Sequence, residues 1–258
     1  MSRIRQAGRA GMLHLGVSVI LALLAAALVF GLWYPFPYST ITGGSELFLL
    51  LVAVDVVCGP LLTLVVFNPV KPRAELVRDI TVIAVLQCAA LLFGLSSVFE
   101  ARPVYLAYEG DRFRVVTAAE IDYQEIDKAP EELRTLSVAG PRLLGVRLLD
   151  GSDPEYMQSI RLAMRGLHPS LRPDRWVEYG AQIDDLLREA HPVTLLRDVL
   201  TTREWENLEE MFSGQGLRSE EVGYLPLVSR WTDTWIVLVS LEDGLPVGYA
   251  PIDGWGEK

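Results

Sequence analysis

The chain has 258 residues, half of them hydrophobic, and a formal net charge of −10. Residues 1–99 hold six basic and four acidic side chains, so the remainder of the chain carries the acidic excess. This acidity, without any basic stripe, argues against nucleic acid as a partner. The composition therefore predicts a membrane anchor over residues 1–99, followed by a soluble domain over residues 100–258.

The first apolar run covers about residues 12–33, follows three arginines and ends in aromatic residues. It is too long for the apolar region of a signal peptide, and no small-residue cleavage site follows it. We therefore expect an uncleaved transmembrane helix. Ser18, Ala22 and Ala26 recur at every fourth position, which predicts a small-residue face for close contact with another helix.

The second apolar run, about residues 47–67, is long enough to cross a bilayer, which takes roughly 20 apolar residues. Asp55 and the pair Gly59-Pro60 lie in its middle. A carboxylate there costs roughly 2.5–3.5 kcal/mol on insertion scales, so Asp55 should face protein or water and not lipid. Pro60 has no N–H for the Val56 carbonyl, which then needs another partner. We expect this helix to depend on its neighbours.

The third apolar run covers about residues 80–98, with Gln87 near its centre. At a rise of ~1.5 Å per residue, Gln87 and Gly59 should be level in an antiparallel helix pair. We predict that the Gln87 amide helps to satisfy the Val56 carbonyl. Two interpretations stay open: Asp55 and Gln87 only hold the three helices together, or Asp55 receives a polar group from a partner's transmembrane helix.

Basic residues fall at the N-terminus and in the loop between the second and third runs, which the positive-inside rule places in the cytoplasm. Three crossings then put everything after Glu100 in the periplasm of a Gram-negative cell. Both cysteines, Cys58 and Cys88, lie in apolar runs, where we interpret them as small apolar fillers. The soluble domain is therefore expected to have no disulfide.

For the soluble part we expect an α+β domain with an antiparallel sheet. Two β-rich runs, 104–108 and 112–116, flank a short turn that contains glycine and predict a hairpin. Three further runs, 222–229, 234–240 and 246–252, predict a meander. The other expected elements are a strand at 142–149 and helical stretches that begin at 117 and near 130 and that cover 153–167, 176–190 and 203–212.

Few residues suggest chemistry. His168 and His191 precede prolines at expected helix ends, where histidine more often completes the helix end than binds a metal. The sequence has no zinc-ligand spacing, nucleophile elbow or phosphate-binding glycine loop. For Trp231 and Trp235, which flank a turn, we favour core packing over an exposed aromatic contact. We therefore predict a binding protein and no enzyme, with no catalytic, cofactor-binding or metal-binding residue.

Two stretches in combination resemble a known family: DVVCGPLLTLVVFNPVKP at 55–72 and ARPVYLAYEGDRFRVVTAAEI at 101–121. From its first helix to about Ile121, roughly the front half, the chain is similar to the type IV pilin accessory proteins (the TfpX/TfpZ family), whereas the back half resembles them only in length and in its acidic α+β character. The resemblance implies an inner-membrane protein without family catalytic residues. It also implies a role in the assembly, surface display or retraction of a particular major pilin.

The expected partners are therefore a type IV major pilin and the lipid bilayer, with no cofactor and with the oligomeric state left open. The three helices would hold the pilin's N-terminal helix, while the domain after Ala101 would contact its head. Two alternatives stay open. An extracytoplasmic sensor acting through a partner would show a pocket with apolar walls and a few polar groups, whereas a flat or convex face would favour pilin docking. A pilin-modifying enzyme would need several carboxylates converging at the membrane surface, which Asp55 alone does not supply.

Overall fold

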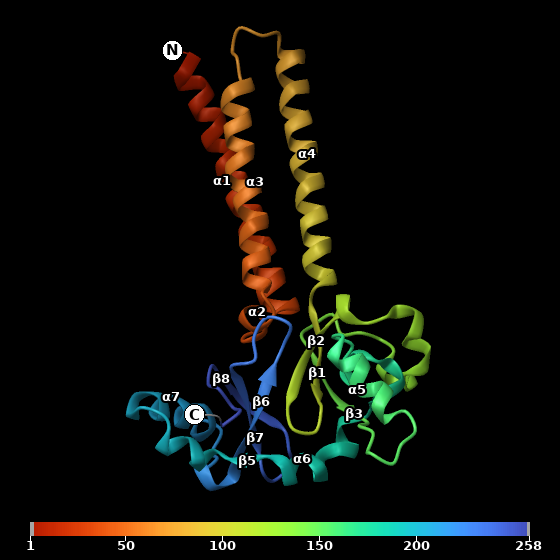
Figure 1. The fold of residues 1–258 in the computed structure, drawn as a ribbon. Coiled ribbons are helices and arrows are strands. Elements are labelled where there is room, and N and C mark those ends of the chain that lie inside the picture. Colours follow the sequence, from red (N-terminus) through yellow and green to blue (C-terminus); the bar gives the residue numbers. More distant parts are fainter. Residues whose placement is uncertain (1–2, 257–258) are drawn as a thin grey trace. The chain divides into compact units, whose positions relative to one another are not determined.

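The computed structural model describes residues 3–256, which are drawn in Figure 1. The chain forms two compact units, Met1–Arg102 and Pro103–Lys258. The first unit consists of helices, and the second contains a sheet with short helices.

The first unit contains three long helices, α1 (Arg3–Leu28), α3 (Gly44–Val66) and α4 (Arg73–Glu100). α1 continues into a π-helical turn, Val29–Trp33, and a short helix, α2 (Tyr38–Ile41), precedes α3. Each long helix is apolar enough over a sufficient length to cross a membrane. The three helices expected from the apolar runs are therefore present.

α3 is the central helix of this unit, because α1 and α4 both pack against it. At one end the Tyr34 hydroxyl donates a hydrogen bond to the Val98 carbonyl at 2.8 Å. Phe30 and Phe48 pack edge to face beside it, with ring centroids 5.0 Å apart. The N-terminus of α1 and the loop between α3 and α4 lie together at the other end (Figure 1).

The second unit is built on one eight-stranded sheet with the strand order β4-β3-β1-β2-β6-β7-β8, in which β5 also pairs with β6. The strands are β1 (Pro103–Tyr108), β2 (Phe113–Thr117), β3 (Arg142–Val146), β4 (Trp176–Val177), β5 (His191–Pro192), β6 (Val222–Val228), β7 (Trp235–Ser240) and β8 (Pro246–Ala250). The expected hairpin is β1–β2 and the expected meander is β6–β7–β8, both antiparallel.

The sheet is nevertheless mixed, so the prediction of an antiparallel sheet is wrong at two places. β1 pairs with β3 in parallel, and β2 pairs with β6 in parallel. Parallel neighbours need a crossover of about a dozen residues or more. Residues 109–141, which include β2, connect β1 to β3, and residues 118–221 connect β2 to β6. The local turns that the sequence reveals do not encode these long-range pairings.

The helices of this unit are α5 (Tyr156–Met164), α6 (Ile183–Glu189) and α7 (Thr202–Ser213). The single helix expected over 176–190 is wrong at its start, where Trp176 lies in β4. The Trp176 ring is buried, and its indole N–H donates to the Ser170 carbonyl at 2.7 Å. Burial of this ring therefore outweighs the helical pattern that follows it.

Two expected helix starts differ in detail. Thr117 and Glu120 form the predicted capping box, but it opens a 3-10 turn and not an α-helix. Asp153 accepts a hydrogen bond from the Glu155 N–H at 2.9 Å, and α5 begins only after Glu155. The helix expected near residue 130 is one 3-10 turn, Glu131–Leu133.

Two hydrophobic clusters stabilise the sheet. One contains β1, β3 and β4 residues such as Tyr105 and Trp176, and the other packs α7 onto β6, β7 and β8 through Trp205, Leu208 and Phe212. Trp231 lies outside both clusters with 67% of its surface exposed, so the preference for core packing is wrong for this residue. The turn between β6 and β7 carries it into solvent.

Thr201 caps α7, and its replacement gives the first test of this fold. The Thr201 side chain and the Glu204 carboxylate form a capping box, with the Thr201 N–H donating to Glu204 at 2.9 Å. We expect Thr201→Ala to lower the free energy of unfolding by about 1 kcal/mol. Thr202→Ala is the matched control, because the cap of α7 that the structure describes uses Thr201 and not the neighbouring threonine. Thermal unfolding of the detergent-solubilised chain should show a lower Tm for the first variant only; equal Tm values would contradict the capping assignment.

Candidate functional site

The polar residues predicted in the middle of the apolar runs lie together between α3 and α4. Asp55 is only 7% exposed, although most of the surface of α3 is exposed. The side-chain amide nitrogen of Gln87 donates to the Asp55 carbonyl oxygen at 3.0 Å and lies 3.2 Å from its carboxylate Oδ1. The acid therefore faces the neighbouring helix and not the outside of the unit.

Gly59 sets how closely Gln87 approaches. A Cβ atom built on Gly59 would lie 1.9 Å from the Gln87 Nε2, so the amide rests directly on the glycine backbone. The predicted contact with the Val56 carbonyl is wrong by one residue, because Gln87 reaches the Asp55 carbonyl instead. Asp55 and Gly59 are four residues apart and share a helix face, whereas Val56 lies about 100° further around the helix. Pro60 is buried beside them.

The polar centre formed by Asp55 and Gln87 has more acceptors than donors. The Gln87 Oε1 is buried and has no hydrogen-bond partner among the described residues. Gln87 is a donor through its amide nitrogen, which already faces Asp55. An amide oxygen such as the Gln87 Oε1 can only accept a hydrogen bond. A group that donates a hydrogen bond would therefore complete this centre.

A second polar contact joins α1 to α3. The His14 Nδ1 lies 2.6 Å from the Thr63 hydroxyl, and both residues fall inside apolar helices. The spacing of the apolar runs does not predict this pair. One sequence feature could have predicted it: each apolar run has a polar residue near the end that carries the basic residues.

The small-residue face of α1 is used within the chain. Ser18 is buried, whereas Ala22 and Ala26 are half-buried and Ala25 is buried in place of Ala26. Steps of four residues drift about 40° per step around a helix, so the expected stripe turns from the buried Ser18 to the half-buried Ala26, which still packs against the cluster that contains Val29 and Phe48. Because this face packs against α3, it is not available to a second protein in this arrangement.

The outer surface of the unit is apolar. Between 11% and 22% of the residues in the three apolar windows are buried, which leaves most side chains for lipid or for another helix. Cys58 and Cys88 are on this outer surface as free cysteines, so their interpretation as buried fillers is wrong.

The second unit has an open pocket of about 970 Å³ between the β1–β2 turn, the residues after β3, α5 and α6. Leu148, Ile160 and Met164 line its apolar wall, and Tyr108 and Glu109 contribute polar groups. This face is therefore neither flat nor convex. Among residues 3–256, no three His, Cys, Asp or Glu side chains gather as a metal site.

Both histidines of this unit lie outside helices. His191 is in β5, with its ring centroid 5.5 Å from that of Tyr224, and His168 precedes the 3-10 turn Pro169–Leu171 beside the pocket. Burial lowers the pKa of His168, and the Arg114 guanidinium lowers it further. Three other charges act on its pKa: Arg112 lowers it, whereas Glu109 and Glu120 raise it.

Insertion of one methyl group tests the contact between α3 and α4. We expect Gly59→Ala to displace the Gln87 amide and to destabilise the chain by about 1–3 kcal/mol, as overpacking does. The double variant Gly59→Ala with Gln87→Ala should recover part of this loss. Gly16→Ala is the control, since a Cβ there meets nothing within 4 Å. Thermal unfolding in detergent distinguishes these cases, and a Gly59→Ala chain as stable as the control would disprove the contact.

Acidification tests the burial of His168. Because its pKa in the folded chain is below the ordinary value of 6.5, the folded state disfavours its protonation. Stability from this residue is present above pH 6.5 and is lost as the pH falls toward the folded pKa. We expect the Tm of His168→Gln to fall less between pH 7.5 and 5.5 than that of the unmodified chain. Parallel curves would mean that His168 does not contribute.

Comparison with known proteins gives the family. The model of the family "Fimbrial assembly protein FimB" matches residues 2–43. The serogroup E1 and serogroup I fimbrial assembly proteins of Dichelobacter nodosus are 32% and 33% identical to the chain over 227 residues, which is 88% of this chain and 88% of each relative. The protein of serogroups C1 and C2 is 38% identical over 117 residues, 45% of this chain and 89% of that relative. No solved structure matches the chain. The chain therefore belongs to the fimbrial assembly protein family FimB.

Proposed function

We propose that the chain is an inner-membrane accessory protein of the TfpX/TfpZ type that binds the N-terminal helix of its cognate type IV major pilin. Through this contact it modulates pilus assembly, surface display or retraction. The observation that carries the proposal is the polar centre of Asp55 and Gln87, in which Asp55 is buried between apolar helices and the Gln87 Oε1 has no donor among the described residues. The relatives of the chain are named for fimbrial assembly and not for a chemical reaction.

The missing donor favours a polar group on the incoming helix. Carboxylate and amide oxygens accept hydrogen bonds, so a hydroxyl, an amide N–H or an ammonium group suits them. A donor group on a transmembrane helix is costly in lipid unless it is paired. A pilin helix with a donor at the depth of Asp55 would therefore gain stability by binding to α3 and α4. Because α1 uses its small residues against α3, the proposed docking face includes Asp55, Gly59, Pro60 and Gln87 and excludes Ser18, Ala22 and Ala26 as a free surface.

The proposed orientation has the N-terminus in the cytoplasm and the second unit in the periplasm. The basic residues Arg5, Arg9, Lys71 and Arg73 lie in α1 and in or beside the α3–α4 loop, at one end of the helical unit (Figure 1). The positive-inside rule favours the cytoplasm for this end. The second unit follows the C-terminus of α4, at the opposite end of that helix.

A second candidate function is a sensor of a small ligand that acts through a partner. The pocket of the second unit favours it, because apolar side chains and a few polar groups line a concave site. Its open form and its exposed apolar wall are less typical of a small-molecule site than of a surface that a polypeptide covers. We therefore rank the sensor below pilin binding.

Recovery of pilin with the purified chain tests the proposed function. We expect Asp55→Leu combined with Gln87→Leu to reduce co-purification of the major pilin by about three- to tenfold, the range for one membrane hydrogen bond. The double change removes both polar partners, so neither is left unpaired in the apolar unit. Cys58→Ala, an exposed change on the same helix, should leave recovery unchanged.

The measurement is the ratio of pilin to bait after solubilisation of cells that produce both proteins. Tm values of the purified variants, matched within a few degrees, would show that a loss is not caused by unfolding. Undiminished recovery with a normally folded double variant would remove Asp55 and Gln87 from the contact and would overturn the proposal.

A further inference from the structure

We infer that the pocket of the second unit is a separate binding site for an extended, nearly neutral peptide segment of a partner polypeptide, with apolar side chains against its wall. The pocket lies between the β1–β2 turn, α5 and α6. This site goes beyond the proposed function, which rests on the helical unit alone.

The first observation is an unpaired donor. Tyr108, at the end of β1, lines the pocket and is 0% exposed. Its hydroxyl is buried and has no hydrogen-bond partner in the part of the chain that the structure describes. A buried donor without a partner is unfavourable, and such groups are rare in folded proteins. A backbone carbonyl of a bound peptide would accept this hydrogen bond.

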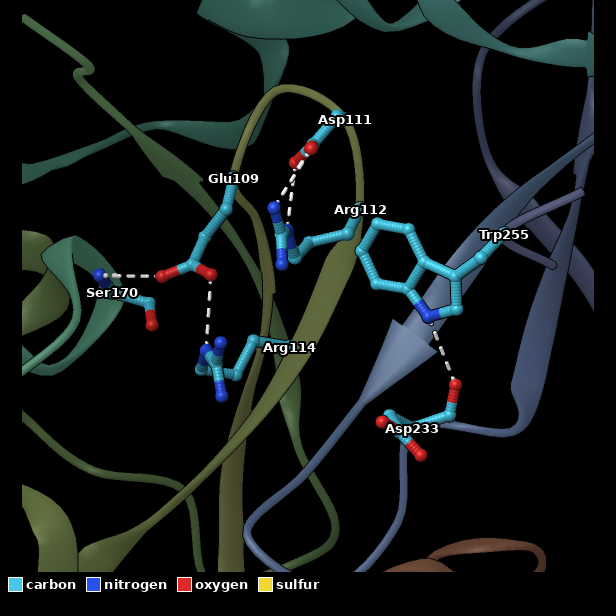
Figure 2. Close-up of polar contacts among 7 residues, drawn as sticks. All are labelled: Glu109, Asp111, Arg112, Arg114, Ser170, Asp233 and Trp255. Carbon is cyan, nitrogen blue, oxygen red and sulfur yellow. Dashed lines mark hydrogen bonds and ion pairs between the residues drawn. The ribbon is translucent and has the colours of Figure 1, made fainter. Parts of the chain in front are cut away.

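The second observation is that the charged groups beside the β1–β2 turn already have partners. Figure 2 shows the Glu109 carboxylate between two donors, the Arg114 guanidinium and the Ser170 N–H, each at 3.0 Å. Arg112 is held by Asp111 at 2.7 Å and stacks on Trp255, with the guanidinium carbon 4.6 Å from the ring centroid. These ion pairs shape the edge of the pocket and leave the Tyr108 hydroxyl as its unsatisfied buried group.

The third observation is the balance of charge. Four arginines and four carboxylates line the pocket: Arg112, Arg114, Arg147 and Arg188, with Glu109, Asp111, Asp185 and Glu189. Ion pairs join six of these residues, and none is found for Arg147 or Glu189 among the described residues. A balanced lining does not concentrate anions as a phosphate or nucleotide site does. It suits a peptide backbone, which carries donors and acceptors in equal number.

The fourth observation is an apolar wall that its own unit leaves uncovered. α5 has no buried residue, and its Ile160 and Met164 line the pocket with 37% and 83% of their surfaces exposed. Leu148 adds a further exposed apolar side chain. Methionine is flexible and packs against side chains of different shape. The wall therefore suits the varied apolar side chains of a peptide, and a volume of about 970 Å³ is at the upper end for a small molecule.

Selection of random peptides tests this inference without reference to pilin. The full chain in lipid nanodiscs would be panned against phage that display random 12-residue peptides, in parallel with the variant Ile160→Glu. We expect enrichment, on the unmodified chain alone, of peptides that contain apolar residues and have little net charge. Labelled synthetic copies would then give Kd values by fluorescence polarisation, with shuffled copies as controls.

Three variants separate the site from the rest of the unit. We expect Ile160→Glu to raise the Kd more than tenfold, because it places a charge in the apolar wall. Tyr108→Phe should raise the Kd about three- to tenfold, the value of one hydrogen bond. The Tm of Tyr108→Phe should stay equal or rise, because the variant removes an unpaired buried hydroxyl. Val199→Glu, exposed and outside the pocket, should leave the Kd unchanged.

Several outcomes would overturn the inference. The first is equal enrichment on the unmodified chain and on Ile160→Glu, and the second is an unchanged Kd for Tyr108→Phe. Concentration-dependent dimers in sedimentation that Ile160→Glu abolishes would assign the pocket to a second copy of the chain. The double variant Asp55→Leu with Gln87→Leu should still bind the selected peptides, so failure of the proposed function and failure of this site are distinguishable.

Discussion

The contact between Gln87 and Asp55 is the interaction on which the helical unit depends. An acid in the middle of an apolar helix is costly in lipid, and Gln87 covers it from the neighbouring helix. Close approach requires Gly59, because any side chain there would occupy the space of the amide. Together with the His14–Thr63 contact on the other side, this pair holds α3 between α1 and α4.

The same contact explains why the helical unit has an unpaired polar group. Gln87 uses its donor on Asp55, which leaves its oxygen buried without a partner within the described chain. The small residues of α1 differ in this respect, because α1 packs against α3 and, of these residues, Ala22 and Ala26 have no polar side-chain atom to satisfy. An internal contact between apolar surfaces can be complete by itself. A contact between two polar groups that have unequal numbers of donors and acceptors leaves one group unpaired. Here the unpaired group is an acceptor, the Gln87 Oε1.

Sequence periodicity gives the depth of a residue along a helix but not its rotation against a neighbour. It placed Gln87 level with Gly59, yet the choice between the Val56 and Asp55 carbonyls depends on 100° of rotation. In the sheet, short turns reveal β1–β2 and β6–β7–β8, whereas the parallel pairs form across long segments without a local signal. Tyr108 could not be identified from sequence, because every residue of β1 is buried and only the geometry shows which hydroxyl lacks a partner.

Each unit has a buried group without a hydrogen-bond partner among the described residues. In the helical unit an acceptor beside Asp55 lacks a donor, and in the second unit the Tyr108 hydroxyl lacks an acceptor. In membranes a single hydrogen bond contributes ~0.6 kcal/mol on average, which is too little to distinguish one partner helix from another. If one polypeptide paired with both groups, its second contact would form at the high effective concentration that the first contact provides. In that case the helical centre would fix the depth of the partner in the bilayer. The pocket would then add a second contact to the same polypeptide.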